Sequence, residues 1–161
     1  MEIRRFFVEP SDINGTFVTL TGDEFLHMVK VLRYKVGFKA IVCANDGVER
    51  LCTVKEIGKD FATLVIDKET AVDVKKAHVT LFAGLLKNNK LDFVFQKAVE
   101  LGVDKIVPFV SANCAETKFS QDRAEKIALE AAKQCGSAYL SKVGALENFD
   151  AVLSSFKDFD T

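Results

Sequence analysis

The chain has 161 residues, of which 48% are hydrophobic and 28% are charged, enough apolar side chains for the core of one ordinary domain or two small ones. This composition excludes disorder over most of the chain, and no apolar run reaches the ~18 residues that a membrane-spanning helix needs, so we expect no membrane association. The net charge of −1 by itself gives no indication of a nucleic-acid partner.

Residues 1–73 have the pattern of a small, mostly antiparallel β-barrel. Short runs of β-branched and aromatic residues alternate with turn residues along this part of the chain. The strongest turn signal is Asn45-Asp46-Gly47, because glycine adopts positive φ without steric cost and such a motif is typical of hairpins. The expected strands cover residues 4–8, 16–20, 38–44, 48–56 and 61–66.

One helix is expected to interrupt these strands. Thr21 can cap its start and Glu24 can reach back to the cap, which is the capping-box pattern. Apolar residues then recur at helical spacing, which gives the helix one face for the core. These residues are Phe25, Met28, Val29 and Leu32.

From about residue 79 the pattern changes to buried strands that alternate with amphipathic helices. This order predicts an open, parallel α/β sheet. The chain is therefore expected to divide near residues 73–77 into a barrel, 1–73, and an α/β part, 74–161. The expected strands cover residues 79–86, 106–110 and 142–146, and the expected helices begin at Asn88 or Asn89, at Ser120 and at Phe149.

The four cysteines form no C-x-x-C pair and are too scattered for a zinc site, so we expect no metal. Cys43, Cys52 and Cys135 lie in apolar patterns and are expected to be buried, reduced thiols. The N-terminus lacks the apolar stretch of a secretory signal. Together these features indicate a cytoplasmic protein.

Positive charge is concentrated in two stretches without any acidic residue, 25–45 and 74–91. Such concentrations favour a bound anion, phosphate above all, although a pair of solvated faces produces the same pattern. The basic residues of these stretches are His27, Lys30, Arg33, Lys35 and Lys39 in the first and Lys75, Lys76, His78, Lys87 and Lys90 in the second.

Within these stretches, four side chains are candidates for RNA contacts. The imidazole of His27 can stack on a base and the guanidinium of Arg33 can bind a phosphate in a fork, but His27 can equally be a half-buried histidine of the helix. Lys87 and Lys90 bracket a helix start that follows a buried strand, where N–H groups and the helix dipole favour phosphate. The alternative for both lysines is an ordinary exposed loop.

Other catalytic motifs are missing from the sequence. Gly84 stands alone inside its strand, so the glycine-rich turn of dinucleotide-binding folds is absent, and no P-loop, H-E-x-x-H or G-x-S-x-G occurs. Glu100, near a helix C-terminus, is poorly placed against the helix dipole. It either pairs with a basic neighbour or is tolerated at the surface.

The same segments resemble a known family. His27-Met28-Val29-Lys30-Val31-Leu32-Arg33 is similar to a helix motif that ends in Val-Leu-Arg, and residues 87–109, KNNKLDFVFQKAVELGVDKIVPF, resemble the most recognisable segment of the same family. Residues 130–136 resemble the helix that follows. On these motifs the chain is similar to the 16S rRNA (uracil-N3)-methyltransferases, which belong to the knotted SPOUT superfamily.

The resemblance implies a PUA-like β-barrel that binds RNA over 1–73 and the first part of a SPOUT-type α/β knot domain, which forms a homodimer, over 74–161. It implies transfer of the methyl group of S-adenosylmethionine to N3 of a uridine in 16S rRNA of the small ribosomal subunit. The residues expected to bind RNA are Arg33, Lys87, Lys90 and His27, with Arg4 and Arg5 at the barrel rim as further contacts.

One part of the family pattern is missing from this sequence. The two glycine-containing loops that form the knot and hold S-adenosylmethionine are not found, so the general base and the cofactor pocket are not assigned and a truncated chain is expected. The alternative is a non-catalytic RNA-binding module with a PUA-like barrel and a dimerising α/β half. A third possibility, an enzyme acting on a phosphorylated small molecule, rests only on the Lys87–Lys90 loop.

Overall fold

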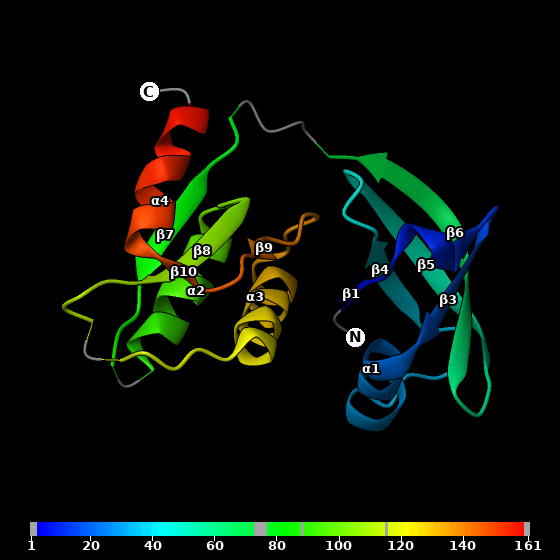
Figure 1. Cartoon of the computed structure of the whole chain (residues 1–161). Coiled ribbons are helices and arrows are strands. Elements are labelled where there is room, and N and C mark those ends of the chain that lie inside the picture. The colour runs from blue at the N-terminus through cyan, green and yellow to red at the C-terminus, as the bar shows by residue number, and fades with distance from the viewer. Residues whose placement is uncertain (1–2, 73–76, 88, 115, 160–161) are drawn as a thin grey trace. The chain divides into compact units, whose positions relative to one another are not determined.

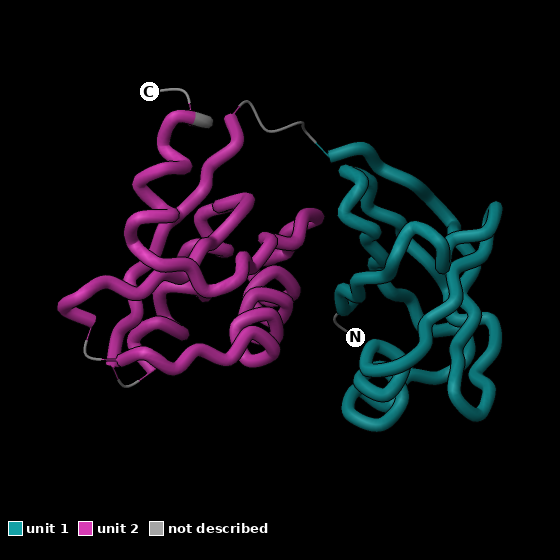
Figure 2. The backbone as a smooth tube through the Cα atoms, in the orientation of Figure 1, with its two compact units in different colours: residues 1–74 teal, residues 75–161 magenta. Residues whose placement is uncertain are grey.

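The computed structural model describes residues 3–72, 77–87, 89–114 and 116–159. Its contacts divide the chain into two compact units, Met1–Val74 and Lys75–Thr161 (Figure 2). Most of the expected division, residues 73–76, lies outside the described residues, and with it the basic residues Lys75 and Lys76. Asn88 also lies outside the described residues.

The first unit is a six-stranded sheet that curls around an apolar core (Figure 1). The strand order is β1-β4-β5-β6-β3-β2; β1 and β4 are parallel and the other neighbours are antiparallel. The core centres on the fully buried side chains of Phe6, Leu20 and Leu64. The strands are β1 (Arg4–Phe7), β2 (Ile13–Asn14), β3 (Phe17–Thr21), β4 (Lys39–Cys43), β5 (Val48–Ile57) and β6 (Phe61–Ala71), with a short 3₁₀ turn, η1 (Pro10–Asp12).

The hairpin predicted at Asn45-Asp46-Gly47 is confirmed and joins β4 to β5. The next hairpin, formed by β5 and β6, continues further than expected. β6 extends to Ala71 rather than ending near residue 66. Its polar second half pairs with the beginning of β5. The buried guanidinium of Arg50 holds this arm together, because it donates to Asp46 at 2.6 Å and to Glu69 at 3.0 Å. Glu69 lies on β6 opposite Arg50 on β5, so a cross-strand ion pair and not an apolar pattern extends the strand.

Two helical segments follow β3, α1 (Gly22–Leu26) and a π-helix, η2 (His27–Val31). The predicted capping box is wrong. Thr21 is the N-cap residue but makes no side-chain cap hydrogen bond, and the carboxylate of Glu24 instead accepts from the backbone N–H of Phe7 at 3.3 Å. Glu24 thus joins the helix to β1.

The second unit contains a parallel sheet in the order β10-β8-β7, with β9 also paired to β8. Phe82 and Phe109 project from the sheet towards α4 and the turn η3 that follows it: Phe156 of η3 lies 5.5 Å from Phe82 and Phe149 of α4 lies 5.7 Å from Phe109, between ring centroids. The helices α2 and α3 pack against each other on the other side (Figure 1). The elements are β7 (Thr80–Gly84), α2 (Lys90–Glu100), β8 (Lys105–Val110), α3 (Gln121–Cys135), β9 (Lys142–Val143), β10 (Glu147–Asn148), α4 (Phe149–Ser155) and η3 (Phe156–Asp158).

The third strand, expected over 142–146, is split into β9 and β10. Gly144 donates its N–H to the carbonyl of Ile106, so even-numbered residues of β8 face this edge. Pro108 is the next even-numbered residue, and it has no N–H to donate. The ladder breaks at this position and resumes at Phe109 and Val110.

The cysteine predictions are confirmed at two of three positions. Cys43 and Cys52 are buried, whereas Cys135 is exposed, contrary to expectation. Cys135 is the last residue of α3, next to the αL cap at Gly136. None of the helices in the described part is long and apolar enough to cross a membrane.

Candidate nucleic-acid interface

The π-helix η2 ends in an unusual cap. Arg33 has φ of 55°, in the left-handed region, and the N–H of Tyr34 donates to the carbonyl of Met28 at 3.0 Å. This hydrogen bond reaches back six residues, one more than the long bond of a Schellman motif, as fits the wider turn of a π-helix; glycine is the usual left-handed residue at such helix ends. A β-carbon in this conformation costs about 1–2 kcal/mol. π-helical segments and strained backbones are both frequent at functional sites.

Two of the predicted RNA contacts of the first unit, Arg33 and His27, lie in η2 or directly after it. Arg33 is exposed and lies among exposed lysines, Lys30 and Lys35. His27 is half-buried, with its ring edge against Phe6 at 6.3 Å between centroids. The side chain of His27 therefore has a packing role as well as one open side.

The two arginines of β1 are placed very differently. Arg4 is exposed, and its backbone N–H donates to the hydroxyl of Tyr34 at 3.2 Å, which joins the start of β1 to the segment that follows η2. Arg5 is almost buried: it pairs with Glu49 at 2.7 Å and donates to Sγ of Cys43 at 2.9 Å. A phosphate would have to displace both partners, so Arg5 belongs to the fold and not to an RNA-binding surface.

In the second unit, the loop after β7 carries exposed Lys87 and Lys90. Asn89 precedes α2 at the N-cap position, but it has φ of 52° and makes no side-chain cap hydrogen bond. Its side-chain oxygen accepts instead from the guanidinium of Arg123 at 3.0 Å, and the same guanidinium pairs closely with Asp92. Arg123 of α3 thus fixes the loop that carries the two lysines.

Glu100 is paired, as one of the two interpretations of its position predicted. Its carboxylate accepts from Lys97 at 2.7 Å and from Gln96 at 2.9 Å. The hydrogen bond from Lys97 is the main cause that lowers the pKa of Glu100. All three groups lie on the surface of α2.

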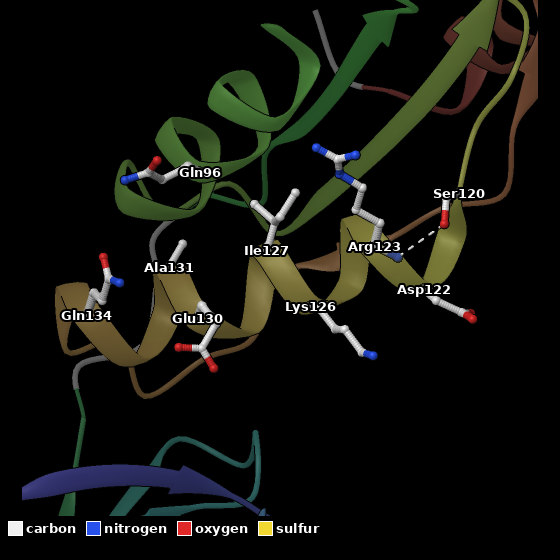
Figure 3. A pocket seen from close by; sticks show the side chains of 9 residues that line it. All are labelled: Gln96, Ser120, Asp122, Arg123, Lys126, Ile127, Glu130, Ala131 and Gln134. Atoms are coloured by element: carbon white, nitrogen blue, oxygen red, sulfur yellow. Dashed lines mark hydrogen bonds between the residues drawn. The ribbon is translucent and has the colours of Figure 1, made fainter. Parts of the chain in front are cut away.

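A groove runs along α3 beside α2 (Figure 3). Its lining combines two cations, two anions and two amides with one isoleucine side chain. The lining residues are Gln96, Ser120, Asp122, Arg123, Lys126, Ile127, Glu130, Ala131 and Gln134. Among the described residues, including those of the groove, no group of three or more His, Cys, Asp and Glu side chains is arranged to hold a metal ion.

Two family models match this chain. The model of an RNA methyltransferase domain matches residues 73–161, more than half of the sequence, and that of an RNA methyltransferase PUA domain matches residues 20–67. The chain belongs to the RNA methyltransferase family. Both units of the structure are thereby accounted for, the first by the PUA model and the second by the methyltransferase model.

Individual relatives agree with this assignment. The chain is 31% identical over 169 residues to Ribosomal RNA small subunit methyltransferase E of Bacillus subtilis, a match that covers 98% of this chain and 66% of the relative. The chain thus spans about two thirds of the length of that relative. A crystal structure described as a predicted RNA methyltransferase from Thermotoga maritima is 26% identical, with a TM-score of 0.76 over 91% of this chain and 67% of that one.

A third structure shows the same fold with a ligand. Ribosomal RNA small subunit methyltransferase E from Neisseria gonorrhoeae, described as bound to S-adenosylmethionine, is 23% identical, with a TM-score of 0.83 over 96% of this chain and 66% of that one. The groove of the present chain does not fit this cofactor. Small-molecule pockets enclose most of their ligand, whereas this groove is open to solvent and carries charges of both signs and no aromatic side chain.

Cys114 was not singled out by the sequence, but its thiol accepts hydrogen bonds from a neighbouring loop residue. Cys114 follows β8, and its Sγ accepts from the backbone N–H of Ser111 at 3.3 Å and contacts Oγ of Ser111 at 3.5 Å. These hydrogen bonds lower the pKa of Cys114. Burial raises the pKa of Cys52 to about 12, and it also raises the pKa of Cys43.

We therefore expect a thiol reagent to divide the four cysteines of the native chain into two classes. Cys114 and Cys135 should react, and Cys114 should reach half its maximal rate at a lower pH than an ordinary thiol, because the thiolate is the reactive form. Cys43 and Cys52 should react only on unfolding. Mass spectrometry of chains labelled at several pH values measures this directly.

The variant Ser111→Ala serves as the control for this labelling. It removes the hydroxyl and should raise the half-rate pH of Cys114 without moving that of Cys135. Labelling of Cys52 in the native chain at the rate of Cys135 would show that the barrel core is not closed around it.

Proposed function

We propose that this protein methylates RNA, transferring the methyl group of S-adenosylmethionine to N3 of a uridine in 16S rRNA of the small ribosomal subunit. The observation that carries the proposal is the pairing of an RNA methyltransferase domain with an RNA methyltransferase PUA domain in one chain. The name of the Bacillus subtilis relative supports ribosomal RNA of the small subunit as the substrate. In this role the protein acts in the cytoplasm and as a homodimer.

We assign RNA binding to two groups of side chains. In the first unit these are Arg33, His27 and Arg4, which lie on the segments joined by the hydrogen bond between Arg4 and Tyr34. In the second unit they are Lys87 and Lys90, at the start of α2. Guanidinium and ammonium groups at such positions bind phosphate oxygens, and an imidazole with one open side can stack on a base.

S-adenosylmethionine supplies the methyl group in this reaction when it is bound. None of the described residues is assigned to the cofactor or to the removal of the N3 proton. The contribution of the described residues is to hold the RNA.

A specific observation favours a second candidate, a non-catalytic RNA-binding module: the groove of the second unit is open to solvent and lined by charges of both signs, unlike the clefts that enclose most of a small ligand. Titration calorimetry with S-adenosylmethionine separates the two functions. If the protein is a methyltransferase, S-adenosylmethionine should bind at micromolar concentration. RNA binding without any binding of the cofactor favours the module.

The third candidate, an enzyme for a phosphorylated small molecule, is separated by the salt dependence of RNA binding. Several phosphate contacts produce a steep, linear fall of log K with log salt concentration. Absence of RNA binding at low salt, with saturable binding of a sugar phosphate, would overturn the proposed function in favour of this enzyme.

A further inference from the structure

The segment around Arg33 exposes apolar side chains as well as cations. Val31 is 69% exposed and Val36 is 61% exposed, two residues before and three residues after Arg33. Single exposed apolar residues are common, but these two valines lie on either side of the left-handed residue. The segment Lys30–Val36, here called the cap segment, is therefore both basic and apolar.

The backbone of the cap segment is held in place. The side chain of Tyr34 is buried and packs edge-on against Phe6 and Phe38, at 5.7 Å between ring centroids in each case. The N–H of Gly37 donates to the carbonyl of Val54 at 2.8 Å, and that of Phe38 donates to Lys35 at 3.1 Å. The valines are thus displayed on a fixed backbone, which lowers the entropy lost on binding.

The charge of the cap segment selects the class of its partner. Lys30, Arg33 and Lys35 are exposed, and the sequence contains no acidic residue between positions 25 and 45. An anionic partner fits this surface. Continuous A-form RNA offers phosphates and sugar hydroxyls but keeps its base faces stacked, whereas unpaired nucleotides offer phosphates together with open base faces.

We propose that the cap segment binds unpaired nucleotides of RNA, with Arg33 on phosphate and Val31 and Val36 against the faces of unstacked bases. This inference rests on the proposed function and deepens it, because it makes a loop or bulge, and not a continuous duplex, the RNA element that the first unit recognises. The apolar contacts supply the preference for unpaired nucleotides, and the cations supply affinity for any RNA.

The test compares two RNAs of equal length and charge, a hairpin with an unpaired loop and a blunt duplex, by fluorescence anisotropy with the full chain. The wild-type chain should bind the hairpin about 10-fold more tightly. The double variant Val31→Thr/Val36→Thr keeps the β-branched shape but replaces methyl groups by hydroxyls. It should lose most of this preference and leave binding of the duplex and the salt dependence unchanged.

The matched control is Val79→Thr, which changes an exposed valine of the second unit. Equal binding of both RNAs by the wild-type chain, or an unchanged preference in the double variant, would overturn the inference and leave the proposed function standing. Absence of binding to either RNA would overturn the proposed function itself. Tighter binding of an acidic polypeptide than of either RNA, lost in the double variant, would assign the cap segment to a protein partner and overturn the inference.

Discussion

Replacement of Arg33 by glycine is expected to strengthen the fold and to weaken RNA binding at the same time. Arg33 occupies a left-handed position that costs a side-chain-bearing residue about 1–2 kcal/mol, while glycine loses more chain entropy on folding, by roughly 0.5–1 kcal/mol. The free energy of unfolding should therefore rise by about 0.5–1 kcal/mol. RNA affinity at low salt should fall about 10-fold or more, because charge-assisted hydrogen bonds to phosphate are lost.

Two further variants separate the two effects of Arg33. Arg33→Ala removes the guanidinium but keeps a β-carbon in the left-handed position, so it should weaken RNA binding equally without the gain in stability. Lys68→Ala removes one positive charge from an exposed position on β6 and should change RNA binding little. Urea unfolding and anisotropy titrations measure both quantities. Unchanged RNA affinity in Arg33→Gly would remove Arg33 from the interface.

The left-handed residues of the structure also show where function competes with backbone preference. Three described residues other than glycine have positive φ: Arg33, Asn45 and Asn89. Asn45 stands in the predicted hairpin turn, and asparagine tolerates this conformation well. Asn89 precedes α2 beside the two loop lysines. Arginine has no such tolerance, and this strain is consistent with the proposed contact of its guanidinium with phosphate.

Local signals in the sequence were sufficient for the elements that depend on local chemistry. The Asn45-Asp46-Gly47 turn and the cap at Ser120 both lie where the pattern placed them. The predictions from sequence fail where a residue far away in the chain determines the hydrogen-bond partner of a side chain. Glu24 has capping-box spacing from Thr21, but an N–H of β1 takes its carboxylate.

The same contrast between local signals and distant partners applies to the candidate site. The lysines of the second unit could be found because a strand end and a helix start are both local features. The sequence could not show that Arg5 is engaged within the fold, since its partner Glu49 lies far along the chain on β5 and is brought near because β1 pairs with β4 and β4 pairs with β5. Arg123 was missed for the same reason: it contacts Asn89 and Asp92 only because α3 packs against α2.

Removal of both loop lysines is expected to have the largest effect in the second unit. In the double variant Lys87→Ala/Lys90→Ala, two phosphate contacts are lost, so the slope of log K against log salt should become shallower by about 0.7 for each lysine. Affinity for RNA at low salt should fall about 10- to 100-fold. Stability should not fall, because Lys90 is the first residue of α2, where a positive charge opposes the helix dipole.

The matched control removes two other exposed lysines of the same unit, Lys105 and Lys157, in the variant Lys105→Ala/Lys157→Ala. Lys105 begins β8 and lies at the amino end of the parallel sheet, whereas Lys87 follows the carboxyl end of β7. Both double variants lose the same charge, so a general electrostatic effect would lower affinity equally in the two. A loss of RNA affinity that is specific to Lys87 and Lys90 requires a binding site at the start of α2. There the backbone N–H groups, the helix dipole and the two ammonium groups act together on the phosphates of one RNA strand.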